Sequence, residues 1–328
     1  MRGEPARTAS HDGPEQPAGI IDTIGQAFAL LSGRPYLIWP PVLLDLFLWL
    51  GVHLSAQPLT DILQQWIRGS SAGNDTTLRQ LQNLGLHYNV FELVGVAMPS
   101  LVQGMGTEPT AGVTPTWIGG LPWGWLALIA AGLLAVGAVV GMAYLTIIGH
   151  LVGLEAIRPE PFVRAAARNV GHLIGFVLVT IGIVILLALP VLTLTIALLV
   201  LGINVLPFAE FVMTVGVLCL FLLLYFGQDA IVVSDAGPMR AVYLSYNVVR
   251  RNFWPTVGFA LISMIVGTGV PLAMSIFTHS PWSMPFALVG HAFVATGMLA
   301  ASMLFYRERA RALLATPVSV PASESRLS

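Results

Sequence analysis

The sequence has no lysine, a single cysteine and very few charged residues. Of its 328 residues, 9% are charged and 56% are apolar, whereas an ordinary soluble domain carries roughly 25% charged residues. This composition excludes a typical soluble protein and predicts a chain that crosses a membrane several times. All 15 basic residues are arginines, and with 16 acidic residues the formal net charge is −1. Without an overall positive charge, the sequence predicts no binding to nucleic acid.

Motifs of known enzymes and cofactor sites are also missing. The lone Cys219 excludes an intramolecular disulfide and a cluster of thiol ligands. The HExxH, Walker A and GxGxxG patterns do not occur, and the histidines and carboxylates lack the spacing of a metal site. We therefore expect no cofactor, no bound metal and no catalytic residues, although the absence of known motifs leaves an intramembrane enzyme open.

Long apolar runs are the main feature that is present. A bilayer core about 30 Å thick takes roughly 20 apolar residues of helix. Six such runs predict an all-α integral membrane protein with six transmembrane helices: 36–54, 123–149, 173–199, 208–227, 253–276 and 284–306. We expect residues 21–308 to form one membrane domain between disordered cytoplasmic tails at 1–20 and 309–328.

The distribution of arginine predicts the orientation of these spans. Thirteen of the 15 arginines precede the first run, follow the last, or lie in the connections after the second and fourth runs. Only Arg68 and Arg79 lie between the first and second runs. Because cytoplasmic segments retain positive charge, we expect both termini on the cytoplasmic side of a bacterial inner membrane. Residues 55–122 are then an extracytoplasmic cap, with short amphipathic helices.

Amphipathic segments precede the first, third and fifth runs. In "GPMRAVYLSYNVVRRNFWPTVGFALI", helical spacing puts an apolar stripe from Met239 to Phe253 beside Arg240 and Arg251. Such a helix lies at the membrane interface with its guanidinium groups at lipid phosphates. The recurrence predicts an internal repeat of three units, each a surface helix followed by two spans. The residues that we expect to meet lipid headgroups are Arg164, Arg168, Arg240, Arg250 and Arg251.

The segment "DAIVVSDAGPMRAVYLSYNVVRRNFWPTVGFALI" combines an acidic turn, an arginine-bearing run and the triplet NFW before a span that contains glycine. It resembles the polytopic membrane domain that is fused to some bacterial glycerophosphodiester phosphodiesterases and that also occurs alone in uncharacterised membrane proteins. The resemblance is clearest over 229–306 and weaker over 155–200. It implies a six-span bacterial membrane protein without an assigned activity, and no phosphodiesterase residue can be matched to this sequence.

Two ionisable residues lie deep within predicted spans. Asp45 is in the first, where an ionised carboxylate costs at least ~2.5 kcal/mol. His291 is in the sixth, and at a rise of about 1.5 Å per residue it reaches a similar depth. One hypothesis is an Asp45–His291 pair that moves protons or binds a cation. The alternative is a structural hydrogen bond, or a protonated Asp45 that bonds a backbone carbonyl.

Small and helix-breaking residues mark further features of the spans. The sequence GAVVG at 137–141 allows close helix packing, and we expect this packing to lie within the bundle. Prolines within three spans predict kinks, and helices broken to expose backbone groups to a substrate are the alternative: Pro40, Pro41, Pro190 and Pro271.

These observations leave two functions open. The first is a non-enzymatic membrane protein that organises lipids or a membrane protein assembly through its arginine-bearing inner helices and its outer cap. The second is a small-molecule or lipid transporter with a site at Asp45. The expected partners are membrane lipids, and either another membrane protein or a second copy of the chain.

Overall fold

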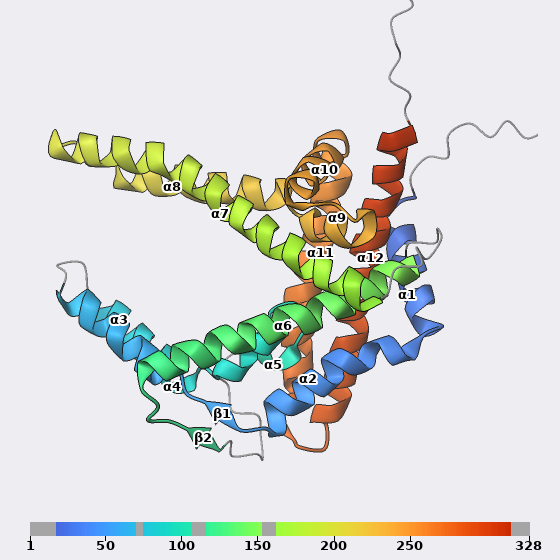
Figure 1. Ribbon diagram of the computed structural model, residues 1–328, viewed down its shortest axis with the longest axis horizontal. Helices are drawn as coiled ribbons and strands as arrows, with labels where there is room; N and C mark the ends of the chain where they lie inside the picture. The colour runs from blue at the N-terminus through green and yellow to red at the C-terminus, as the bar shows by residue number, and fades with distance from the viewer. Residues whose placement is uncertain (1–17, 70–74, 106–115, 153–161, 316–328) are drawn as a thin grey trace, which may run out of the picture.

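Helices make up most of the structure, a computed structural model that describes residues 18–69, 75–105, 116–152 and 162–315 (Figure 1). In chain order the elements are α1 (Ile20–Ser32), η1 (Pro35–Ile38), α2 (Trp39–Leu50), β1 (His53–Leu54), α3 (Gln57–Gly69), α4 (Asp75–His87), η2 (Val90–Gly95), α5 (Leu101–Met105), β2 (Trp117–Ile118), α6 (Trp123–Val152), α7 (Phe162–Val200), α8 (Leu206–Leu223), α9 (Gly227–Ser234), α10 (Pro238–Arg251), α11 (Phe253–Ser275), η3 (Ile276–His279) and α12 (Met284–Ala315). Elements labelled η are 3-10 helices.

Five helical segments are long and apolar enough to cross a membrane, so the chain is a multi-pass membrane protein. They are Trp123–Val152, Val163–Val200, Leu206–Ser234, Phe253–Thr278 and Met284–Leu313. These segments contain the second to sixth predicted spans or match them closely, and the all-α prediction is confirmed. The first predicted span corresponds to a shorter apolar segment, Pro35–Leu50.

The core lies where α9, α11 and α12 meet. Phe226, Phe259 and Phe305 are fully buried there, and the ring of Phe305 stacks on the rings of Phe226 and Phe259 at centroid distances of 5.3 and 4.7 Å. Three large aromatic side chains in mutual contact bury more apolar surface than aliphatic residues at the same positions would. This cluster fixes the relative positions of the three helices that surround the candidate site.

The GAVVG sequence packs within the chain, as expected. An ideal Cβ on Gly137 would lie 2.6 Å from the carbonyl oxygen of Val94, and one on Gly141 would clash with the Cβ of Ala97. Because glycine has no side chain, the backbone of residues 94–97 lies directly against α6. Residues 94–97 were expected to belong to a cap that covers the bundle from outside. In the structure this part of the predicted cap packs directly against α6.

The rest of the predicted cap includes a helical hairpin. α3 and α4 are two short helices within the segment 55–122, where short helices were expected, and Figure 1 shows them extending together from the body. Behind them, β1 pairs in parallel with β2, with His53 opposite Trp117. The side chain of Asn89 accepts hydrogen bonds from the backbone N–H groups of Leu54 and Phe91, which ties η2 to this small sheet.

α7 and α8 differ from the predicted boundaries. α7 is one helix of 39 residues, about 58 Å long, so the amphipathic segment before the third predicted span is continuous with that span. No proline interrupts residues 162–189, and nothing therefore separates the two parts. Figure 1 shows the outer part of α7 and α8 running side by side away from the body, while the first part of α7 packs against α6, α9 and α10.

The fourth span contains a break that the sequence did not predict. α8 ends at Leu223 and α9 begins at Gly227. The hydroxyl of Ser245, on α10, donates to the carbonyl of Leu223 at 2.8 Å and accepts from the N–H of Phe226 at 3.2 Å. These two bonds satisfy backbone groups that the helix break would otherwise leave unpaired.

α10 is a separate helix, and its buried face coincides with the predicted stripe only in part. Ala241, Ser245 and Val248 are fully buried, while Met239 is 70% exposed. Small side chains let the backbone of α10 approach its neighbours closely. The predicted stripe is therefore divided: part packs against the protein and part remains on the surface.

The first and last described helices pack together at one end of the molecule. α1 packs along α12, with the rings of Phe28 and Phe293 at 5.5 Å, and the guanidinium Nη2 of Arg309 donates to the carbonyl of Ala18 at 3.3 Å. α12 continues to Ala315, so residues 309–315, expected to begin a disordered tail, are helical. The remainder of the predicted tails, 1–17 and 316–328, lies outside the described residues.

Candidate functional site

Asp45 organises the short helix α5. Its Oδ1 accepts from the hydroxyl of Ser100 at 2.5 Å and from the N–H of Val102 at 3.3 Å, and its Oδ2 accepts from the N–H of Leu101 at 2.9 Å. Asp45 is fully buried. A carboxylate at a helix N-terminus satisfies free N–H groups and complements the helix dipole. The side chain thus acts as an N-cap supplied from another helix, which agrees with the structural alternative for this residue.

His291 lies in a different environment. Among the described residues no hydrogen bond joins it to Asp45, and its Nδ1 is buried without a hydrogen-bond partner. Its side chain lines a cavity of about 370 Å³ between the α8–α9 segment, α11 and α12. The two candidates are therefore not brought together as a pair, and His291 belongs to a second feature that the sequence did not reveal.

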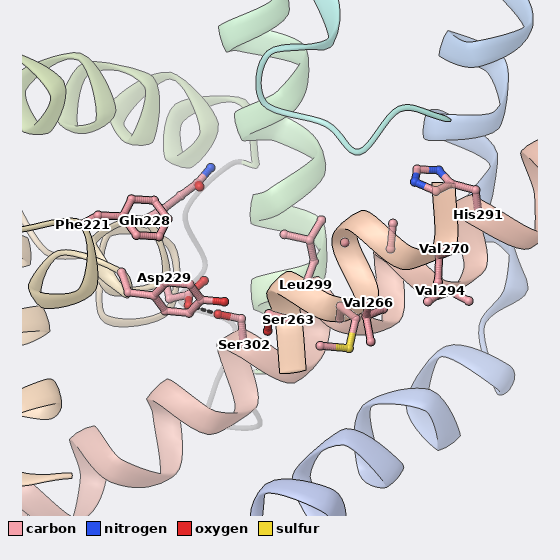
Figure 2. A pocket seen from close by; sticks show the side chains of 14 residues that line it. Phe221, Gln228, Asp229, Ser263, Val266, Val270, His291, Val294, Leu299 and Ser302 are labelled. Carbon is pink, nitrogen blue, oxygen red and sulfur yellow. Dashed lines mark hydrogen bonds between the residues drawn. The ribbon is translucent and has the colours of Figure 1, made fainter. Parts of the chain in front are cut away.

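The cavity has polar ends and an apolar middle. Figure 2 shows Asp229 beside Ser302 at one end and His291 at the other, with Val270 and Val294 toward the His291 end. Positions 291 and 302 on α12 are separated by about 16 Å along the helix axis. Six polar side chains line the cavity: Tyr225, Gln228, Asp229, Ser263, His291 and Ser302. Such a shape suits an elongated molecule with polar groups at its ends.

Asp229 is the buried carboxylate of this cavity. It is 6% exposed, and its Oδ2 accepts a hydrogen bond from the hydroxyl of Ser302 at 2.5 Å. Sequence reasoning ended the fourth span at Gly227 and did not select Asp229 as a candidate, whereas the apolar segment continues through α9 to Ser234. The sequence feature that could have revealed Asp229 is the run Ala-Ile-Val-Val directly after it, because these apolar residues continue the span beyond the carboxylate.

The five lipid-headgroup candidates lie near one end of the fold, on α7 and α10. Arg164, Arg240, Arg250 and Arg251 are exposed. Arg168 instead forms an ion pair with Asp235, with its Nη2 2.8 Å from the Oδ1 of Asp235. Asp235 directly follows the C-terminus of α9. Asp235 has a positive φ of 49°, so the ion pair holds a left-handed turn between α9 and α10. Arg168 thus stabilises the fold through this ion pair, apart from the contact with lipid headgroups that was expected for it.

Metal binding finds no support in the described ranges, since no group of three histidine, cysteine or carboxylate side chains lies close enough to hold an ion. The polar groups of the cavity are mainly hydroxyls and amides, which are poor ligands for transition metals.

A family model described as a domain of unknown function (DUF7847) matches residues 86–307. The chain belongs to the DUF7847 family. The matched region covers more than half of the sequence and includes every residue that lines the cavity, whereas Asp45 precedes it. No curated protein and no solved structure matches the chain. For this DUF7847 protein, function must therefore be argued from its own residues.

Proposed function

We propose that the chain is a six-span protein of the bacterial inner membrane. The Arg309–Ala18 hydrogen bond supports this number, because two points of the chain on the same side of a membrane are joined by an even number of crossings. Five long segments and Pro35–Leu50 make six. The segment Pro35–Leu50 has 16 residues and spans about 24 Å, which is short for a bilayer core and requires local thinning of the bilayer.

Both termini are on the cytoplasmic side in this proposal. The exposed arginines belong to α10 and the first turns of α7, and Figure 1 shows these segments near the C-terminal part of α12, which carries Arg309 and its bond to Ala18. Arg68 and Arg79 belong to the α3–α4 hairpin, which extends away from that end. An excess of arginine on one side favours the cytoplasm for that side.

The function that we favour is non-enzymatic: the basic inner face organises anionic lipids around the protein. The surface of α10 carries the argument. Met239, Tyr243 and Tyr246 are 70%, 65% and 40% exposed and fall on one helical stripe. Arg240 and Arg251 lie beside it. Exposed apolar and aromatic side chains flanked by arginine are typical of a helix that rests in the headgroup region.

The test compares two pairs of arginines. The double variant Arg240→Ala with Arg251→Ala is extracted into native nanodiscs, and the ratio of phosphatidylglycerol to phosphatidylethanolamine is measured by mass spectrometry. At about 1 kcal/mol per arginine at the surface, enrichment of the anionic lipid at each site should fall about fivefold. Arg68→Ala with Arg79→Ala changes the charge equally on the α3–α4 hairpin and should leave the ratio unchanged. Equal ratios in all three proteins refute the proposal.

A second candidate, transport of a small molecule, is favoured by the cavity. The oxygens of Asp45 accept hydrogen bonds from α5, so Asp45 is occupied in the fold. The residues that we propose to contact a transported molecule are therefore Asp229 and His291, which line the cavity. The test of transport is access from both sides. In a Cys219→Ser background, Ala295→Cys puts a thiol on the cavity wall. Labelling by an impermeant maleimide added to each side of the membrane in turn supports transport, whereas labelling from only one side contradicts it.

A further inference from the structure

We propose that the cavity binds a monovalent lipophilic organic cation, with the ammonium group at Asp229 and the hydrocarbon part along α11 and α12. This assignment deepens the transport candidate and rests on the same cavity, but it concerns binding and does not require that the ligand cross the membrane.

The carboxylate lacks a cationic partner in the cavity. Among the lining residues the ionisable side chains are Tyr225, Asp229 and His291, and none is a lysine or an arginine. Asp229 is 6% exposed and bonded to the neutral hydroxyl of Ser302. An ionised carboxylate at this burial needs a compensating positive charge. A ligand cation supplies that charge where the residues that line the cavity do not.

Aromatic rings beside the carboxylate favour an ammonium group. Phe221 and Tyr225 both line the cavity, and their rings meet edge to face at 6.1 Å. Figure 2 shows Phe221 at the same end as Asp229. Aromatic faces attract organic cations through their electron-rich surfaces, and this attraction grows when the cation is desolvated. A metal ion, in contrast, requires several oxygen ligands, and Asp229 is the single carboxylate among the lining residues.

The middle of the cavity selects a hydrocarbon body. Val266 and Leu299 line this part (Figure 2), and Phe221, which also lines the cavity, is 65% exposed. Since Phe221 is on the outer surface of α8, the cavity reaches the side of the bundle, where an apolar ligand enters from the bilayer. At the far end the unpartnered Nδ1 of His291 offers a hydrogen bond to a polar group on a longer ligand.

Two glycines on α11 provide a matched pair of variants. Gly267 lines the cavity and has open space where a Cβ would be, whereas Gly269 has equally open space but is not part of the lining. A leucine at either position improves helix propensity by a similar amount. Only Gly267→Leu puts a side chain into the cavity, so this variant blocks the site while the carboxylate remains.

The experiment uses the full chain in lipid nanodiscs and tritiated benzyltrimethylammonium as the probe. The wild-type protein should bind it saturably, and neopentylbenzene, the uncharged isostere, should not compete. Binding should weaken at least about tenfold in Asp229→Asn and to the same extent in Gly267→Leu, whereas Gly269→Leu should bind as the wild type does. Absence of saturable binding, full binding by Asp229→Asn, or equal loss in both glycine variants overturns the proposal.

The outcomes separate this proposal from transport. Saturable binding with maleimide access from one side alone retains the cation site and excludes transport. Access from both sides without saturable binding of the probe excludes the cation site and leaves transport of another molecule.

Discussion

Replacing Asp45 by alanine should destabilise the protein through α5. The substitution removes an acceptor from the hydroxyl of Ser100 and from the N–H groups of Leu101 and Val102. A hydrogen bond to a charged group contributes about 1.5–3 kcal/mol, and buried donors left unpaired add a desolvation cost. Because α5 can shift and recover part of this loss, we expect the free energy of unfolding to fall by about 3–5 kcal/mol. Asp45→Asn keeps one acceptor oxygen and should cost about 1–2 kcal/mol.

Reversible unfolding in mixed detergent micelles measures the global effect. Hydrogen exchange measures the local one, since the amides of Leu101 and Val102 should lose their protection before the amides of α12 do. Asp61 is the control, because it is an exposed carboxylate on α3, and Asp61→Ala should change the free energy of unfolding by less than about 0.5 kcal/mol.

Two results would refute the capping role of Asp45. One is an Asp45→Ala protein as stable as the Asp61→Ala control. The other is an alanine variant that is destabilised but retains normal protection at Leu101 and Val102, because the lost energy would then come from a contact outside α5.

Two other features of the fold give further predictions. Gly141→Ala should lower the free energy of unfolding by about 1–3 kcal/mol, because the new methyl group meets Ala97; Gly132→Ala on the same helix has open space and should be neutral or stabilising in the same unfolding assay, and equal effects would contradict the close packing. Burial raises the pKa of Glu92, on η2, to about 7 from an ordinary value of 4.5, so the folded state binds more protons than the unfolded state in that interval. Stability should therefore fall as pH rises from about 4.5 to about 7, and midpoints of unfolding should show a weaker decline in Glu92→Gln; identical pH profiles would exclude Glu92 as a source.

The sequence predicted the elements whose signals are local. The apolar run at 123–149 and the one at 284–306 became α6 and α12, because a run long enough to cross a bilayer carries its own evidence. The packing of the GAVVG sequence within the bundle also followed from small residues at helical spacing.

The candidate site was harder to predict, because its contacts connect distant segments. Asp45 was recognised as unusual, but its partner Ser100 lies 55 residues away in a segment that had been assigned to the outer cap. Asp229 was missed because Gly227 and Gln228 resemble the end of a span, whereas Ser245 of α10 stabilises a break within the helix. Neither relation can be read from spacing alone.

The contact between α1 and α12 has a consequence for biosynthesis. A ribosome releases α1 first, yet the surface that receives Phe28, formed in part by Gly297 of α12, is made almost 270 residues later. Until then the apolar face of α1, including the fully buried Ala27 and Leu31 of the finished protein, lacks its main partner, because α1 packs chiefly against α12. The last span to be inserted thus completes the docking of the first helix, and a nascent chain that stops before α12 leaves that helix open to chaperones and proteases.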